Sequence, residues 1–198
     1  DTFDTYTRLF DCLADDSGYY QKSIPLRHPL IFYLGHTATF FVNKLVLAKI
    51  LKERINPNME SIFAVGVDEM SWDDLNDDHY DWPAVQEVLD YRAQVRQTVL
   101  ELIETMPLSL PIDWDSNWWP IVMGIEHERI HLETSSVLIR QHALERVQPQ
   151  PEWAPIRETG EAPENELLTV PAGKVHIGKP YDDAFYGWDN EYGEHQAD

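Results

Sequence analysis

The residues best suited to chemistry in this chain form the motif His127-Glu128-Arg129-Ile130-His131. The surrounding residues, 118–141, carry apolar side chains at helical spacing, so both imidazoles are expected one turn apart on the same face of a helix. Two imidazoles in this position can bind a first-row divalent metal and leave most of its coordination sphere open. A third ligand must therefore come from another part of the chain.

The letters H-E-x-x-H also match the zinc peptidases, in which Glu128 would act as the general base. A peptidase would take its third ligand from a residue further along the chain, such as His142 or Glu152. Neither position carries the G-x-x-H continuation of the longer zincin motif. A zinc peptidase is therefore one interpretation of the motif, beside a metal site in the core of a helical bundle.

The remaining histidines differ in how well their surroundings suit a metal ligand. A site in a bundle core draws its ligands from facing helices, and His36 fits this best. It lies in the apolar stretch LGHTATFF, and the preceding Gly35 lets another part of the chain approach closely. We expect the other histidines at the surface, namely His28, His79, His142, His176 and His195.

Four segments carry apolar residues at the spacing of amphipathic helices. They span residues 2–14, 29–54, 83–106 and 118–141. The sequence DDSG at 15–18 should end the first helix, and Asn56-Pro57 should end the second. Asp115 or Ser116 can cap the fourth helix. The pattern predicts a mainly α fold, an antiparallel four-helix bundle.

A long connection separates the second and third expected helices. Residues 58–82 show no sustained period and carry acidic clusters at Asp73-Asp74 and Asp77-Asp78. We expect an irregular connection with a short helical turn. Connections of this length are usually functional or mobile.

The last quarter of the chain differs from the bundle in composition. Proline and glycine in a polar background predict an extended linker after residue 148. Residues 167–170 and 174–177 flank Pro171-Ala172-Gly173 and predict a hairpin of two short strands. The predicted division of the chain is 1–148 for the bundle, 149–166 for the linker and 167–198 for the start of a second, β-containing domain.

Composition and charge narrow the classes of function. With 35 acidic and 15 basic residues, the formal net charge of −20 repels phosphate backbones and anionic lipids, so neither nucleic acid nor a membrane is an expected partner. No apolar run approaches the roughly 20 residues of a membrane span. The single cysteine, Cys12, suits a reducing compartment, and we expect a cytoplasmic protein. Because the sequence lacks an initial Met and ends among polar residues, we expect a fragment of a longer chain.

Three longer motifs carry a resemblance to a known family: RHPLIFYLGH at 27–36, AVGVDEMSWDDL at 64–75 and GIEHERIHLET at 124–134. Together they resemble the 5-histidylcysteine sulfoxide synthases of ovothiol biosynthesis, which are similar to the ergothioneine sulfoxide synthases. The sequences APENELL at 162–168 and YGWDNE at 186–191 look like the start of the family's second domain. The resemblance covers nearly the whole chain.

The resemblance implies a DinB-like four-helix bundle followed by a domain of the formylglycine-generating-enzyme type, with its C-type-lectin-like fold. The family's non-haem Fe(II) is held by three histidines that map onto His36, His127 and His131. Three imidazoles on one face of an octahedron leave three positions for substrate and O2. The implied reaction joins the sulfur of L-cysteine to the imidazole ring of L-histidine and yields a sulfoxide. Glu128 would then point off the metal face as a solvated or ion-paired carboxylate.

Substrate recognition is implied at a few positions. Arg92 and Arg96 lie one turn apart on the third helix and are candidates for binding the cysteine carboxylate, although the related ergothioneine enzymes space their arginine pair differently. Ile130 replaces a polar residue of the ergothioneine synthases, which favours the ovothiol branch. The family's catalytic tyrosine and the rest of its second domain are expected beyond Asp198.

Two other functions stay open from the residues alone. A zinc-dependent hydrolase or thiol transferase on the same bundle would use the same three histidines and one water. A bundle that only binds a partner protein would keep His36, His127 and His131 as ordinary core residues. Metal analysis, together with oxygen uptake in the presence of cysteine and histidine, separates these functions.

Overall fold

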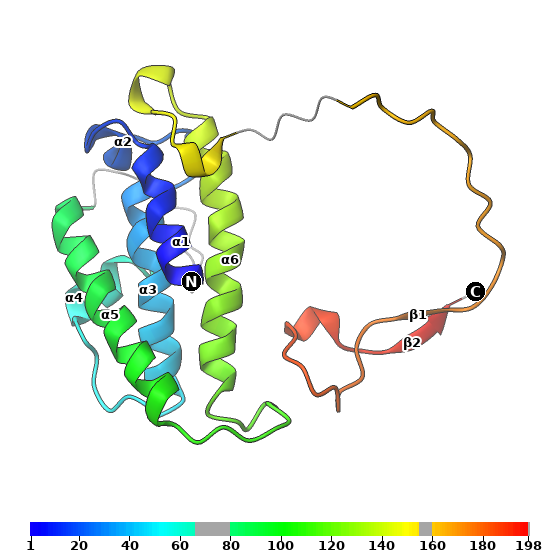
Figure 1. The fold of residues 1–198 in the computed structure, drawn as a ribbon. Helices are drawn as coiled ribbons and strands as arrows, with labels where there is room; N and C mark the ends of the chain where they lie inside the picture. Colours follow the sequence, from blue (N-terminus) through cyan, green and yellow to red (C-terminus); the bar gives the residue numbers. More distant parts are fainter. Residues whose placement is uncertain (66–79, 155–159, 198) are drawn as a thin grey trace.

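Four helices form the body of the protein: α1 (Thr2–Leu9), α3 (Leu30–Leu47), α5 (Val85–Thr105) and α6 (Trp119–Arg140). The computed structural model describes residues 1–65, 80–154 and 160–197. The four helices lie side by side as a bundle (Figure 1), in which α3 packs against α5 and α6, and α1 packs against α6. The mainly helical fold predicted from the apolar spacing is confirmed.

Helix α3 is the central element of the bundle and is apolar on nearly all sides. Phe32, Leu34 and Leu45 are completely buried. By length and composition alone this helix could cross a membrane, so it comes closer to a membrane span than the sequence analysis expects. About two thirds of it (67%) is buried inside the bundle, and a core helix surrounded by other helices needs this composition.

Helices α5 and α6 begin and end close to their predicted limits. Pro120 lies in the first turn of α6, where its missing N–H has no helical partner to lose. The predicted caps of α6 are wrong, because the N-cap is Trp118. Ser116 lies before the N-cap and stabilises the turn that leads into the helix, because its hydroxyl accepts a hydrogen bond from the backbone N–H of Trp118 at 3.2 Å.

Helix α3 ends at Leu47, although the apolar pattern predicts a helix that continues to residue 54. Lys49 adopts a left-handed backbone conformation, with a φ of 60°. The N–H of Ile50 then bonds to the carbonyl of Leu45 at 3.0 Å and closes the helix. This stop is usually made by glycine, so a lysine gives no sequence signal for it.

Two short elements replace parts of the first predicted helix and its break. The first helix ends at Leu9 and continues only as the 3-10 turn η1 (Phe10–Cys12), so the prediction of a helix to residue 14 is wrong. The expected break at 15–18 overlaps α2 (Ser17–Tyr20). Asp15 accepts hydrogen bonds from both the backbone N–H and the hydroxyl of Ser17, which starts this turn.

The connection after α3 contains the helical turn that the sequence analysis expects. Helix α4 (Pro57–Ile62) begins at the proline that was predicted to stop the preceding helix. Asn56 caps it, because its side-chain oxygen accepts the N–H of Met59 at 3.2 Å. The acidic clusters Asp73-Asp74 and Asp77-Asp78 lie outside the described residues.

Residues 144–153 run back along the first helix. They contain the 3-10 turns η4 (Leu144–Arg146) and η5 (Pro151–Trp153). The side-chain amide of Gln148 donates to the carbonyl of Leu13 at 3.0 Å. At the surface, Glu152 pairs with Arg8 at 2.8 Å. The first residues of the predicted linker, 149–166, therefore contact the bundle.

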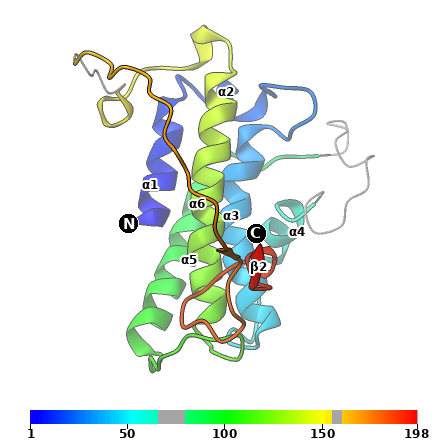
Figure 2. The ribbon, with the colours of Figure 1, turned by 90° about the vertical axis from the view of Figure 1, so that its right-hand side faces the viewer.

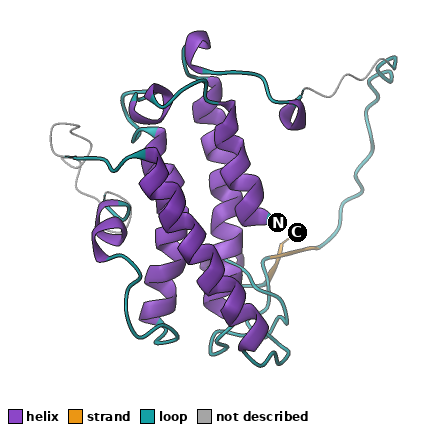
Figure 3. Ribbon diagram, turned by 60° about the vertical axis from the view of Figure 1, so that its left-hand side comes forward, coloured by secondary structure: helices purple, strands orange, loops and turns teal. Residues whose placement is uncertain are grey.

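The chain from residue 160 onward arches away from the bundle and returns beside the lower part of α6 (Figures 1 and 2). The strands β1 (Val175–Ile177) and β2 (His195–Ala197) pair antiparallel and are small beside the helices (Figure 3). The predicted pairing of 167–170 with 174–177 is wrong. The first of these segments is extended and exposed, and the turns beside the real strands use the positive φ angles of Gly178 and Gly193.

Candidate metal centre

Three histidines from two helices meet inside the bundle. His36 comes from α3, and His127 and His131 come from one face of α6. One ring nitrogen of each residue lies within 4.8 Å of those of the other two, and the Nε2 atoms of His127 and His131 are 3.2 Å apart. Two nitrogens at adjacent positions of one ion, each about 2.1 Å from it, would lie roughly 3 Å apart. The structure brings the three predicted ligands together at a spacing that suits one ion.

Close approach of the helices brings these histidines within reach of one another. A Cβ atom at Gly124 of α6 would overlap the ring of Phe41 on α3. A Cβ atom at Gly35 would overlap the ring of Phe63. The sequence analysis expects close approach at Gly35, and an aromatic ring occupies the space there.

Phe63 also fixes the protonation of His36. Its backbone carbonyl lies 2.7 Å from His36 Nδ1 and accepts a hydrogen bond from it. Because a carbonyl oxygen only accepts, Nδ1 carries a proton, and in the neutral ring the lone pair is then on Nε2. Metal-binding histidines commonly have this support on their second nitrogen. Phe63 gives no signal of this role in the sequence, because a contact made by a backbone carbonyl does not depend on residue type.

Aromatic rings of α3 restrict the orientation of two imidazoles. Phe40 stacks on His127 with ring centroids 3.7 Å apart and planes 9° from parallel. Phe32 stacks on His36 at 5.1 Å and 14°. Such contacts bury the faces of the rings and leave their edges available. In the sequence, Phe32 and Phe40 are only part of an apolar stretch. In the structure, they also hold the rings of the candidate ligands.

Burial keeps the two histidines of α6 neutral. It lowers the pKa of His127 from its usual value of 6.5 to about 2, and the neighbouring His131 and His36 add to this effect. Burial and His36 likewise lower the pKa of His131 to about 3. Neutral imidazole is the form that binds a metal, because protonation occupies its lone pair. At neutral pH these two imidazoles therefore present lone pairs and carry no positive charge.

The cluster fits a mononuclear divalent metal by the chemistry of its donors. The Nε2 atoms of His127 and His131 face each other, and a cation between them would satisfy both lone pairs. Their Nδ1 atoms are buried and have no hydrogen-bond partner among the described residues. Among the described residues, no carboxylate or thiolate lies close enough to join the three imidazoles as a further ligand. Octahedral Fe(II) would keep three open positions on this donor set, and tetrahedral zinc would keep one.

Glu128 points into the bundle and is only 1% exposed. Its Oε1 lies 2.9 Å from Arg92 Nη2 and accepts a hydrogen bond from the Thr37 hydroxyl at 3.2 Å. The expectation of an ion-paired carboxylate is confirmed, and the alternative of a solvated one is wrong because the side chain is buried. A carboxylate held by a guanidinium is poorly placed to take a proton from a metal-bound water. This arrangement argues against the peptidase interpretation.

The two arginines proposed for substrate binding have carboxylate partners within the protein. Arg92 is 1% exposed and pairs with Glu128. Arg96 is partly exposed and pairs with Asp4 at 2.7 Å, and this hydrogen bond lowers the pKa of Asp4. A contact of either arginine with a cysteine carboxylate stays a prediction, and Arg96 is the one that solvent can reach.

The other histidines of the described residues do not join the three. His28 and His142 were expected at the surface, but both are buried. Neither joins the three-histidine group. His176 and His195 are exposed, as predicted. His79 lies outside the described residues.

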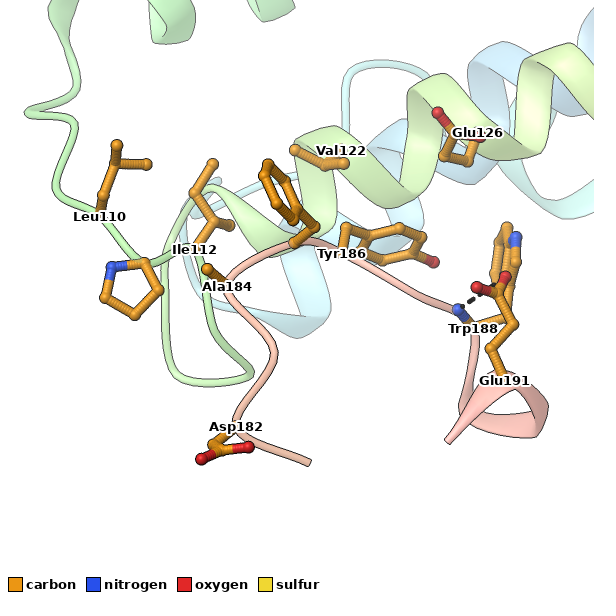
Figure 4. Close-up of a pocket in the computed structure, with 11 residues that line it drawn as sticks. Leu110, Ile112, Val122, Glu126, Asp182, Ala184, Tyr186, Trp188 and Glu191 are labelled. Atoms are coloured by element: carbon orange, nitrogen blue, oxygen red, sulfur yellow. Dashed lines mark hydrogen bonds between the residues drawn. The ribbon is translucent and has the colours of Figure 1, made fainter. Parts of the chain in front are cut away.

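A cavity of about 890 Å³ lies between α6, the loop before it and the C-terminal segment (Figure 4). Glu126 of α6 lines one side, and Tyr186 and Trp188 line the opposite side. The ring of Tyr186 also contacts Trp119 at 4.6 Å, so the segment is held against α6. Because Glu126 directly precedes His127, the cavity borders the helix that carries two of the candidate ligands. Its volume is that of a small-molecule site.

The helical bundle and its three-histidine cluster define the class of the domain. The sequence profile of the DinB superfamily matches residues 1–135, and the chain belongs to that superfamily. Two curated relatives share the name Ergothioneine biosynthesis protein 1. The Neurospora crassa protein is 29% identical in an alignment 208 positions long, which covers 96% of this chain and 23% of the relative. The Schizosaccharomyces pombe protein is 24% identical in an alignment 214 positions long, which covers 90% of this chain and 27% of the relative. The chain thus spans about a quarter of the length of these relatives.

Proposed function

We propose that this chain is the metal-binding part of an O2-dependent sulfoxide synthase in which His36, His127 and His131 hold a non-haem Fe(II). The observation that carries the proposal is the meeting of three imidazoles, two of them kept neutral by burial, at one point of the bundle. Both relatives are named for the biosynthesis of ergothioneine, a compound in which sulfur is attached to an imidazole ring. A metal with open positions suits such chemistry.

The proposed reaction joins the sulfur of L-cysteine to an imidazole carbon of L-histidine. The S–H bond and one imidazole C–H bond break, and a C–S bond forms. The sulfur takes one oxygen atom of O2, and the two hydrogens leave with the other oxygen atom as water. When bound, iron supplies the redox chemistry that couples the reduction of O2 to this oxidation.

The residues of this chain contribute position and a dry environment. Phe32 and Phe40 hold the rings of His36 and His127, and the buried cluster keeps water from their faces. The cavity beside Glu126 offers aromatic walls close to the ligand helix. We propose that residues 167–198 open a domain of the formylglycine-generating-enzyme type, which supplies the catalytic tyrosine and completes the pocket.

The finer assignment to the ovothiol branch rests on Ile130. This residue precedes His131 and is 46% exposed. An apolar side chain there gives a substrate no hydrogen bond, whereas the ergothioneine synthases carry a polar residue. We therefore propose L-histidine as the imidazole substrate and L-cysteine as the thiol. A cytoplasmic location is part of the same proposal.

The test uses the natural full-length protein, loaded with Fe(II) without oxygen and then given cysteine, histidine and O2. Oxygen uptake should require both amino acids, and the product should weigh one oxygen atom more and two hydrogen atoms less than their sum. The His127→Ala variant is the control and should consume no oxygen. Tightly bound zinc with no oxygen uptake would favour the hydrolase or transferase. A protein that binds no metal would support a bundle that only binds a partner.

A further inference from the structure

We propose that Arg92, Glu128 and Thr37 form a register cluster that fixes α3 against α6 and thereby sets the geometry of the metal site. The proposal rests on the proposed function only in requiring that the three histidines bind a metal. It gives the Glu of the H-E-x-x-H motif a positioning role in place of the general-base role known from peptidases.

The register cluster joins three helices at the residues next to the ligands. Arg92 of α5 donates from Nη1 to the hydroxyl of Thr37 at 2.7 Å and from Nη2 to Oε1 of Glu128 at 2.9 Å. The hydroxyl of Thr37 donates to the same Oε1 at 3.2 Å and closes a triangle of hydrogen bonds. Thr37 directly follows His36, and Glu128 directly follows His127. The triangle therefore ties α3 to α6 next to the site where the imidazoles meet.

Directional contacts are needed because apolar packing does not fix the register of two helices. Apolar contacts are non-directional, and packed helices can shift by about 1–2 Å. A slip of one residue moves a side chain by about 1.5 Å along the helix, whereas a metal site tolerates about 0.2 Å. A slip of α6 would separate Glu128 from Arg92 of α5 and leave a buried charge without its partner, which is strongly unfavourable. A slip of α3 would break the hydrogen bonds of Thr37 with both charged residues.

The burial of the register cluster makes this constraint strong. The side chains of Arg92 and Glu128 are 2% and 1% exposed, so water cannot replace a lost contact. Oε2 of Glu128 has no hydrogen-bond partner among the described residues, so the carboxylate depends on the contacts of Oε1. The guanidinium is anchored in turn by the carbonyl of Leu34 at 2.9 Å and the hydroxyl of Thr7 at 3.0 Å. The pair is therefore held from several sides.

A matched control lies one turn further along α5. Arg96 pairs with Asp4 at 2.7 Å, and both side chains are about two-fifths exposed. This pair links α5 to α1. It has the same chemistry as Arg92 and Glu128, but it lies at the surface and away from the contact of α3 with α6.

The experiment measures the binding of Co(II), as a spectroscopic probe, to the 198-residue chain. The paired variant Arg92→Met with Glu128→Leu replaces the buried charges by apolar groups, which usually preserves folding. We expect a circular dichroism spectrum like that of the wild type and a Kd for Co(II) raised about 10- to 100-fold, the range known for groups that orient metal ligands. The control pair Asp4→Asn with Arg96→Gln should leave this Kd within about twofold.

A second measurement asks whether the effect passes through His36. The paired variant should shift the Co(II) absorption bands towards those of His36→Ala, because it displaces the same imidazole from the ion. When His36→Ala is added to the paired variant, the Kd should not exceed that of His36→Ala alone, whereas independent effects would add. Thr37→Val should raise the Kd, and Thr37→Ser, which keeps the hydroxyl, should not.

Four results would overturn the inference. A folded paired variant that binds Co(II) as tightly as the wild type would remove the register role alone. Full additivity with His36→Ala would show a general loss of stability. If the paired variant does not fold, equal affinities of Thr37→Val and Thr37→Ser would refute the inference. A wild-type chain that binds no Co(II) would overturn the proposed function, and the register role with it.

Discussion

A metal-binding imidazole must be unprotonated at one nitrogen and held in place, and the three residues of this site meet both conditions in different ways. His36 donates a hydrogen bond from Nδ1 to the backbone carbonyl of Phe63, which leaves the lone pair of the neutral ring on Nε2. His127 is stacked under Phe40, and burial lowers its pKa and that of His131 far below neutral pH. The spacing of His127 and His131 is visible in the sequence, because a helix repeats every 3.6 residues. The contacts of His36 with the Phe63 carbonyl and of His127 with the ring of Phe40 are not visible, because each joins segments far apart in the sequence.

Removal of one imidazole of α6 should weaken metal binding more than the loss of a supporting group does, and it should leave the fold intact. His127→Ala or His131→Ala should weaken metal affinity by more than about a hundredfold, beyond the range seen when only a supporting group is lost. Folding should persist because buried apolar side chains, such as Leu34 and Leu45, stabilise the bundle. Metal content by mass spectrometry and thermal unfolding by circular dichroism measure the two effects.

The control for this prediction is His142→Ala. His142 is also buried on folding, but it lies outside the three-histidine group. This variant should keep its metal. If His127→Ala unfolds without metal, the bundle depends on the ion, and the apolar core is weaker than its burial indicates.

At the scale of the helices, Lys49 offers a direct test of why α3 ends early. A non-glycine residue in the left-handed region costs roughly 1 kcal/mol, and glycine removes this cost. Lys49→Gly should therefore raise the free energy of unfolding by about 0.5–1 kcal/mol in urea titrations. Lys49→Ala keeps the strain and is the matched control. A gain with alanine as large as that with glycine would mean that the lysine side chain, and not the backbone, is unfavourable.

The contact between Gly124 and Phe41 makes the opposite prediction for another glycine. Alanine favours a helix over glycine by about 1 kcal/mol, so Gly124→Ala would stabilise an exposed helix. Here the added methyl group would overlap a buried ring, and overpacking costs about 1–3 kcal/mol. We expect a net loss of up to about 2 kcal/mol in chemical unfolding. The same change in a Phe41→Leu background should cost less, and an equal cost there would place the strain elsewhere.

How far the sequence predicts the elements depends on the range of the interactions that end them. The limits of α5 and α6 follow from apolar spacing and from prolines, which act locally. The sequence predicts that Asn56-Pro57 ends the second helix, but these residues start α4. Asparagine at the N-cap and proline in the first turn both suit the start of a helix. The partner of β1 could not be predicted, because β2 pairs with it across a long sequence separation and leaves the nearer segment 167–170 exposed. The contact of Arg92 with Glu128 is equally non-local, since 36 residues separate them.

For the whole molecule, the large negative charge opposes the compact state. A formal net charge of −20 on 198 residues produces self-repulsion that the few ion pairs at the surface offset only in part, since exposed pairs contribute little. Repulsion between exposed charges acts over the Debye length, which falls from about 30 Å at 0.01 M salt to about 8 Å at 0.15 M. Salt should therefore stabilise this protein, whereas it weakens proteins held by surface ion pairs.

We expect the free energy of unfolding to rise by about 1 kcal/mol between 0.01 M and 0.3 M NaCl, which corresponds to roughly 2–4 °C in Tm for a chain of this size. Most of the rise should occur below about 0.15 M, where screening changes most. The matched control combines Glu104→Lys, Glu133→Lys and Glu145→Lys at exposed positions, and each change reduces the excess negative charge by two. This variant should be more stable than the wild type at low salt and respond less to NaCl. An equal response of both proteins would attribute the effect to general salting-out of apolar surface and not to charge.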